Sequence, residues 1–116
     1  MKNFLFIMTH PPHDGVQLQE QLDVILTTAA FDQKVALLFL DEGVFQLKKG
    51  QNPKNQGLKD TASIFNALEI YDVNDIYTEV ESLQERGLKP SDLSLPVQEF
   101  YRKDINELIQ RYDIIL

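Results

Sequence analysis

Two short stretches of the sequence carry the side chains best suited to chemistry, and the first is a histidine pair. His10 and His13 flank two prolines, and Asp14 follows directly. Imidazole and carboxylate groups so close together can ligate a divalent metal ion. The prolines, however, favour an extended backbone on which the two rings need not converge, and a third ligand would have to come from elsewhere. A turn at the edge of a sheet is the simpler interpretation, so we expect neither a metal nor another cofactor.

The second stretch is the carboxylate pair Asp41-Glu42, which follows an apolar run. Adjacent carboxylates form an acid/base pair only when the backbone aims both inward, and no His, Ser or Lys beside them supplies a nucleophile or a base. Gly43 permits an unusual backbone angle, which indicates a shaped turn. Val44 and Phe45 then either face a partner protein or pack in the core. We expect no catalytic residue here and take the whole stretch as a candidate partner interface.

The composition excludes several classes of function. Cysteine does not occur, which rules out disulfides, cysteine-type zinc sites and thiol catalysis. Lys and Arg number 11 against 18 Asp and Glu, and the net charge of −7 argues against direct nucleic-acid binding. The apolar run that follows Lys2 is too short for a signal-peptide core or a membrane span. We therefore expect a soluble, cytoplasmic protein.

Hydrophobic patterning predicts alternating strands and helices in a single domain, residues 1–116. Strands are predicted at 3–9, 34–40, 75–80, 93–97 and 113–116. Helical spacing occurs at 16–31, 58–72, 82–86 and 101–112, and the polar segment 48–60 is the longest loop. Because Pro96 cannot donate to a strand ladder, we expect residues 93–97 at a sheet edge. The alternation implies a three-layer α/β/α sandwich whose functional edge is the carboxyl end of the strands.

Four stretches follow one another in the order of a known family. They are the N-terminal strand with PHDG at 12–15 and LDVILTTAAF at 22–31, DEGVFQLKKGQNP at 41–53, ALEIYDV at 67–73 running on to SLQERGL at 82–88, and YDIIL at 112–116. Together they span nearly the whole chain. This combination resembles the TusC/DsrF family, which comprises small subunits of sulfur-relay complexes.

The resemblance implies a mainly parallel five-stranded sheet of the DsrE/DsrF type. It also implies a heterohexamer with two copies each of TusB-, TusC- and TusD-like chains, served by a TusE-like carrier. Such complexes move persulfide sulfur towards 2-thiouridine at the wobble position of tRNA. In DsrEFH relatives the same architecture serves sulfur oxidation.

In this family the working cysteine belongs to the TusD-like subunit and sits at the end of the third strand, just before a short helix. Counting back from Arg86-Gly87, the resemblance assigns that position to Glu79. A thiolate takes up sulfur because it is a soft nucleophile, and a carboxylate is a poor substitute. We therefore expect a non-catalytic subunit. Two alternatives stay open: a stand-alone enzyme that uses His10, His13 and the carboxylates, and a self-associating DsrE-like binding protein.

Overall fold

A parallel sheet forms the centre of the computed structural model, which describes residues 2–11, 15–31, 33–48, 68, 70–93 and 96–116. In this part of the chain five strands lie in the order β4-β3-β2-β1-β5, and every neighbouring pair is parallel. The strands are β1 (Asn3–Met8), β2 (Lys34–Phe39), β3 (Asp75–Glu79), β4 (Gln98–Phe100) and β5 (Ile114–Ile115). The predicted parallel five-stranded sheet is confirmed.

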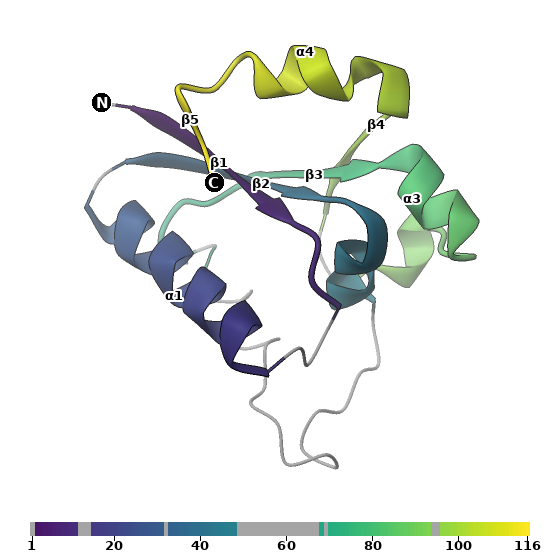
Figure 1. Ribbon diagram of the computed structural model, residues 1–116, viewed down its shortest axis with the longest axis horizontal. Coiled ribbons are helices and arrows are strands. Elements are labelled where there is room, and N and C mark those ends of the chain that lie inside the picture. The colour runs from purple at the N-terminus through teal and green to yellow at the C-terminus, as the bar shows by residue number, and fades with distance from the viewer. Residues whose placement is uncertain (1, 12–14, 32, 49–67, 69, 94–95) are drawn as a thin grey trace.

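Helices cover both faces of this sheet, as Figure 1 shows, with α1 on one side and α4 on the other. Side chains alternate between the faces of a strand, so continuous apolar runs such as those of β1 and β2 fill two cores at once. Leu22 and Ile25 of α1 (Gly15–Ala30) are fully buried against Phe6 and its neighbours. Ile105 and Leu108 of α4 (Ile105–Ile109) pack on the opposite face. The predicted three-layer sandwich is confirmed.

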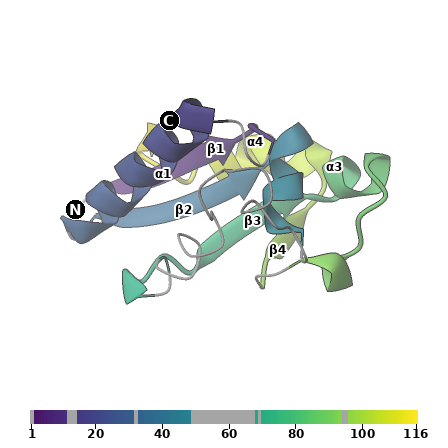
Figure 2. The same ribbon diagram turned by 90° about the horizontal axis from the view of Figure 1, so that it is seen from below.

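The carboxyl ends of the central strands lead into two short helices. Strand β2 continues into the 3-10 helix η1 (Asp41–Leu47), and β3 continues into α3 (Val80–Glu85). Helix α3 ends near Gly87, whose φ of 69° lies in the left-handed region that favours glycine. Figure 2 shows η1 and α3 together at the same end of the sheet. This is the edge at which the sequence placed the functional residues.

The fourth strand lies further along the chain than predicted. Residues 93–97 do not form it; Leu93 makes only an isolated antiparallel bridge with Lys48, and β4 begins after Pro96, at Gln98. Proline lacks the N–H that a ladder requires, so regular pairing starts beyond it. The predicted edge position is confirmed, because β4 pairs with β3 on one side only in the described sheet.

The C-terminal part is more broken than the predicted helix at 101–112. The 3-10 helices η3 (Pro90–Asp92) and η4 (Arg102–Asp104) flank β4, and only Ile105–Ile109 are α-helical. The predicted loop at 48–60 and most of the predicted helix at 58–72 lie outside the described residues. Of the helices that the structure does describe, none has the length and apolar character needed to cross a bilayer.

Candidate functional site

Glu79 stands where β3 ends and α3 begins, at the carboxyl edge of the sheet. Its exposed fraction is only 6%. Its Oε1 atom accepts hydrogen bonds from Arg102 Nε at 3.1 Å, from Arg102 Nη2 at 2.8 Å and from Ser82 Oγ at 2.7 Å. Glu79 therefore lies at the end of the third strand and just before a short helix, as expected for the position counted back from Arg86-Gly87. That a relay thiol sits there in relatives stays a prediction.

These contacts decide the charge of Glu79. Burial on its own raises the pKa of the carboxyl group. The hydrogen bonds from Arg102 and Ser82, together with the positive charges of Arg102 and Arg86, outweigh burial and hold the pKa of Glu79 below its ordinary value of 4.5. The hydrogen bonds that Arg102 donates to Glu79 and Glu85 raise the pKa of Arg102 above its ordinary value. At neutral pH the site is therefore an ion pair between a buried carboxylate and a half-exposed guanidinium.

Ser82 connects Glu79 to the neighbouring strand end. Its hydroxyl donates to Glu79 Oε1 and accepts a hydrogen bond of 3.0 Å from the backbone N–H of Asp41. Asp41 has a φ of 50°, a left-handed conformation that asparagine and aspartate tolerate better than most residues. The buried carboxylate of β3 is thus coupled, through one hydroxyl, to the turn that starts η1.

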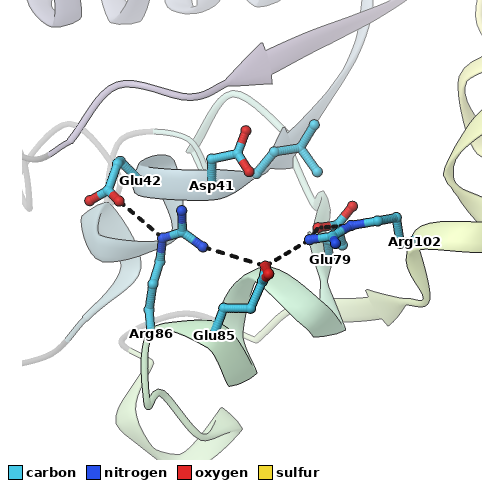
Figure 3. Close-up of a pocket in the computed structure, with 7 residues that line it drawn as sticks. Asp41, Glu42, Glu79, Glu85, Arg86 and Arg102 are labelled. Atoms are coloured by element: carbon cyan, nitrogen blue, oxygen red, sulfur yellow. Dashed lines mark hydrogen bonds and ion pairs between the residues drawn. The ribbon is translucent and has the colours of Figure 1, made fainter.

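Beyond the Glu79–Arg102 ion pair, acidic and basic side chains alternate along the surface (Figure 3). Arg102 Nη2 also lies 2.7 Å from Glu85 Oε1, and Arg86 Nη1 lies 3.8 Å from the same oxygen. Arg86 Nε then binds Glu42 Oε1 at 3.2 Å. The resulting row, which we call the charge row, runs Glu42, Arg86, Glu85, Arg102, Glu79. The carboxylates Glu42 and Glu85 are more than half exposed, so their ion pairs order the surface more than they stabilise the fold.

The charge row borders a cleft of about 640 Å³. Its lining consists of Leu40, Asp41, Glu42, Glu79, Glu85, Arg86 and Arg102. None of these side chains is a soft nucleophile, and the buried carboxylate among them, Glu79, is already ionised and hydrogen-bonded. Chemically the cleft can hold and orient charge, but it lacks a group that could carry sulfur covalently.

The motif that starts at Asp41 is largely a packing device. A Cβ atom on Gly43 would collide with the backbone carbonyl of Met8, so only glycine fits this close approach. Val44 is fully buried, which favours core packing over partner contact for that residue, whereas Phe45 is partly buried against the same core and its contact with a partner stays a prediction. Asp41 and Glu42 are exposed. Whether they contact a partner stays a prediction.

The histidine pair is only half visible. His10 follows β1, and its carbonyl oxygen accepts a hydrogen bond of 2.6 Å from Gln46 Nε2. His13 and Asp14 lie outside the described residues, so their arrangement is not tested. Within the described ranges, no three His, Cys, Asp or Glu side chains lie close enough to hold a metal ion.

Sequence reasoning missed four members of the site: Ser82, Glu85, Arg102 and Arg86, the last of which served only as a counting reference for Glu79. Ser82, Glu85 and Arg86 had a usable signal, since residues three and four apart on a helix share a face and SLQERGL places these three at that spacing. Arg102 had none. It reaches Glu79 only because β4 lies beside β3 in the sheet.

Comparison with known proteins gives concordant matches. Residues 2–116 match the model of a family described as DsrE/DsrF-like. A protein named TusC homolog from Pseudomonas aeruginosa is 38% identical over 99% of this chain and 97% of its own length. A TusC homolog from Aliivibrio fischeri is 33% identical over 100% of this chain and 98% of its own length. The intracellular sulfur oxidation protein DsrF of Allochromatium vinosum is 41% identical over 80% of this chain and 68% of its own length. The crystal structure of the ychN protein from E. coli superimposes with a TM-score of 0.78, over 100% of this chain and 98% of that one, at 15% identity, which bears on the fold alone.

Proposed function

Because the chain belongs to the DsrE/DsrF-like family, as its match over residues 2–116 shows, we propose that it is a non-catalytic, TusC-like subunit of a sulfur-relay complex. The observation that carries this proposal is the residue found at the end of β3, Glu79. A buried carboxylate, ionised and hydrogen-bonded by Arg102 and Ser82, fills the place that the resemblance assigns to a relay thiol. No other residue of the chain supplies a thiol. The subunit's task is then assembly, and the sulfur is carried by a partner.

The partners we propose are TusB- and TusD-like chains in a heterohexamer, with a TusE-like carrier that visits the complex. The segment Asp41–Phe45 is our candidate for the contact surface. Its exposed carboxylates, Asp41 and Glu42, lie at the rim of the cleft, while Gly43 and Val44 fix the turn from behind. A rigid turn that presents charge at low entropic cost suits a specific docking surface.

We propose thiolation of the tRNA wobble uridine, in the cytoplasm, as the pathway served. In support, the chain spans 97% and 98% of the TusC homologs from Pseudomonas aeruginosa and Aliivibrio fischeri but 68% of the DsrF protein. The DsrF identity of 41% keeps a DsrF-like role in sulfur oxidation as the second candidate. Neighbouring reading frames separate the two, since a TusE-like chain without a dissimilatory sulfite reductase accords with tRNA thiolation and the reverse accords with sulfur oxidation.

Co-expression tests the proposed assembly. The chain, carrying an affinity tag, is produced together with the TusB- and TusD-like chains of its own organism, and the mass of the purified species is measured in solution. We expect a stable complex that contains all three chains. Recovery of this chain only as a free monomer would sink the proposal, and a homo-oligomer that ignores the other two chains would favour the self-associating binding protein.

A charge reversal on the candidate surface sharpens the test. Glu42→Lys reverses one exposed carboxylate at the cleft rim, and Glu20→Lys makes the same change on the exposed surface of α1. We expect Glu42→Lys to lower the yield of partner chains several-fold while Glu20→Lys leaves it unchanged, with both variants retaining wild-type circular dichroism. Equal yields for the two variants would remove Asp41–Phe45 from the interface. Metal analysis of the same purified material addresses the stand-alone enzyme that would use His10, His13 and the carboxylates, and finding no bound metal would count strongly against it.

A further inference from the structure

The environment of Glu79 is a built anion site. Among the described residues, three hydrogen-bond donors converge on its Oε1 atom, and they come from two separate segments of the chain. Two belong to the fork of the Arg102 guanidinium, a geometry suited to anions. The third is the hydroxyl of Ser82, which is itself fully buried and oriented by the backbone of Asp41. These donors recognise a negative charge at a point in space and do not require that it be a carboxylate.

The negative charge that these donors recognise lies at a defined distance from the Cβ atom of residue 79. The carboxylate oxygen of glutamate lies three bonds beyond Cβ, and the terminal sulfur of a cysteine persulfide lies two bonds beyond it. The S–S bond is about 2.0 Å long against about 1.5 Å for C–C, so both terminal atoms lie roughly 3 Å from Cβ. A persulfide anion and a glutamate side chain therefore present the same charge at nearly the same distance. A reduced cysteine, whose sulfur is one bond from Cβ, falls short of the donors.

We propose that Glu79 is a permanent mimic of a cysteine persulfide anion, and that the Arg102–Ser82 site can hold such an anion in its place. This inference rests on the proposal that Glu79 stands where a relay thiol sits in sulfur-carrying relatives. The subunit would then present its partners with the charge of a sulfur-loaded site at every stage of the relay. Glu79 also borders the cleft, where the tip of a persulfide would be reachable. An ion pair that served folding alone would have no need of such access.

The test uses the absence of cysteine from the chain. In Glu79→Cys the introduced thiol is the only one, so every sulfur reaction reports on this position. Glutathione persulfide is the donor: the introduced thiolate attacks its terminal sulfur, a new S–S bond forms, the donor's S–S bond breaks, and glutathione leaves as the thiolate. No oxidant is required. Intact mass then confirms the gain of one sulfur atom.

We expect the melting temperature of Glu79→Cys to rise on persulfidation by roughly 4 °C or more, because the terminal sulfur regains the contacts that the reduced thiol cannot reach. Two controls make the result specific. Glu85→Cys, in the same cleft but exposed, should show no rise, and Glu79→Cys combined with Arg102→Gln should show none either. A rise of the same size in either control, or no rise in Glu79→Cys, would overturn the proposal.

A folding defect does not remove the test. If reduced Glu79→Cys does not fold, the refolding yield before and after persulfidation, followed by circular dichroism, replaces the melting temperature. Recovery that depends on Arg102 supports the proposal, and equal yields with and without the added sulfur contradict it. All of these measurements use the isolated chain, so their failure leaves the co-expression result untouched, and a failed co-expression leaves the anion site untouched.

Discussion

Replacing Glu79 by glutamine keeps the shape of the side chain and removes its charge. The substitution acts on the buried carboxylate that Arg102 and Ser82 hold at the end of β3. Glutamine can still offer one carbonyl oxygen to the donors, but its amide group brings N–H groups into a place already crowded with donors. We expect the fold to survive and the free energy of unfolding to fall.

The size of the loss follows from the contacts. Hydrogen bonds to charged groups contribute about 1.5–3 kcal/mol each, against about 0.5–1.5 kcal/mol for neutral ones. The side chain of Glu79 is 8% exposed, but that of Arg102 is 52% exposed, so water and salt screen much of their attraction. We therefore expect Glu79→Gln to lose about 1–2 kcal/mol in total. For a chain of this length that corresponds to a melting temperature lower by roughly 4–8 °C.

The matched control is Glu85→Gln, which removes the other carboxylate bound to Arg102. Glu85 lies 2.7 Å from the same Nη2 atom, yet its side chain is 54% exposed. Surface ion pairs contribute little, so we expect its melting temperature to change by about 2 °C or less. Calorimetry on wild type and both variants at pH 7 gives the comparison. Equal losses for the two variants would refute the claim that burial makes Glu79 the dominant carboxylate of the charge row.

The difference in melting temperature between wild type and Glu79→Gln should depend on pH. The pKa of Glu79 is held below its ordinary value of 4.5 in the folded state, so its stabilising effect is complete above 4.5 and is lost as the pH falls through the lower, folded value. The gap in melting temperature between wild type and Glu79→Gln should therefore close in acid. Arg102→Gln should raise the pKa of Glu79 relative to wild type, because burial is then opposed only by the hydrogen bond from Ser82 and the charge of Arg86. A gap that stays constant down to the acid limit would contradict the assigned charge.

Three further substitutions test the packing of the fold. Gly43→Ala forces a Cβ atom into the Met8 carbonyl and should lower the urea midpoint by an amount equivalent to about 3 kcal/mol, whereas Gly87→Ala, which faces open space at a φ of 69°, should cost about 1 kcal/mol. Similar midpoints would show that the close approach is relaxed in solution. Tyr112→Phe removes the 2.8 Å bond to the Tyr77 hydroxyl and should cost about 1 kcal/mol. Burial and that bond raise the pKa of Tyr112 above its ordinary value of 10.0, so wild-type stability should fall as the pH rises past 10, and a fall of equal size in Tyr112→Phe would contradict this.

The sequence predicted the fold well where one physical signal dominated. The apolar runs of β1 and β2 have few alternatives to a strand buried on both faces, and the structure places both within one residue of the prediction. Around Pro96 two signals compete, because the apolar residues before it suggest a strand while the missing N–H forbids a regular ladder. The proline prevails, and pairing is delayed to Gln98.

The site was predictable only in part, because its members meet through the tertiary fold. The position of Glu79 was reached through the family resemblance, by counting back from Arg86-Gly87, and the structure places this residue between the end of β3 and the start of α3. Arg102 could not be found in this way, because nothing near it in the sequence indicates that β4 will pair with β3 and deliver it to a buried carboxylate. The sequence also left open whether Val44 faces a partner or packs in the core. The structure shows that its side chain is fully buried.

The mass of each chain in a sulfur-loaded complex tests the central claim most directly. The co-expressed complex is treated with a cysteine desulfurase and cysteine, and the intact masses of its chains are compared before and after loading. We predict that a partner chain gains the mass of a sulfur atom while this chain is present in the complex and unchanged in mass. A gain of sulfur on this chain, or its absence from the loaded complex, would contradict the account.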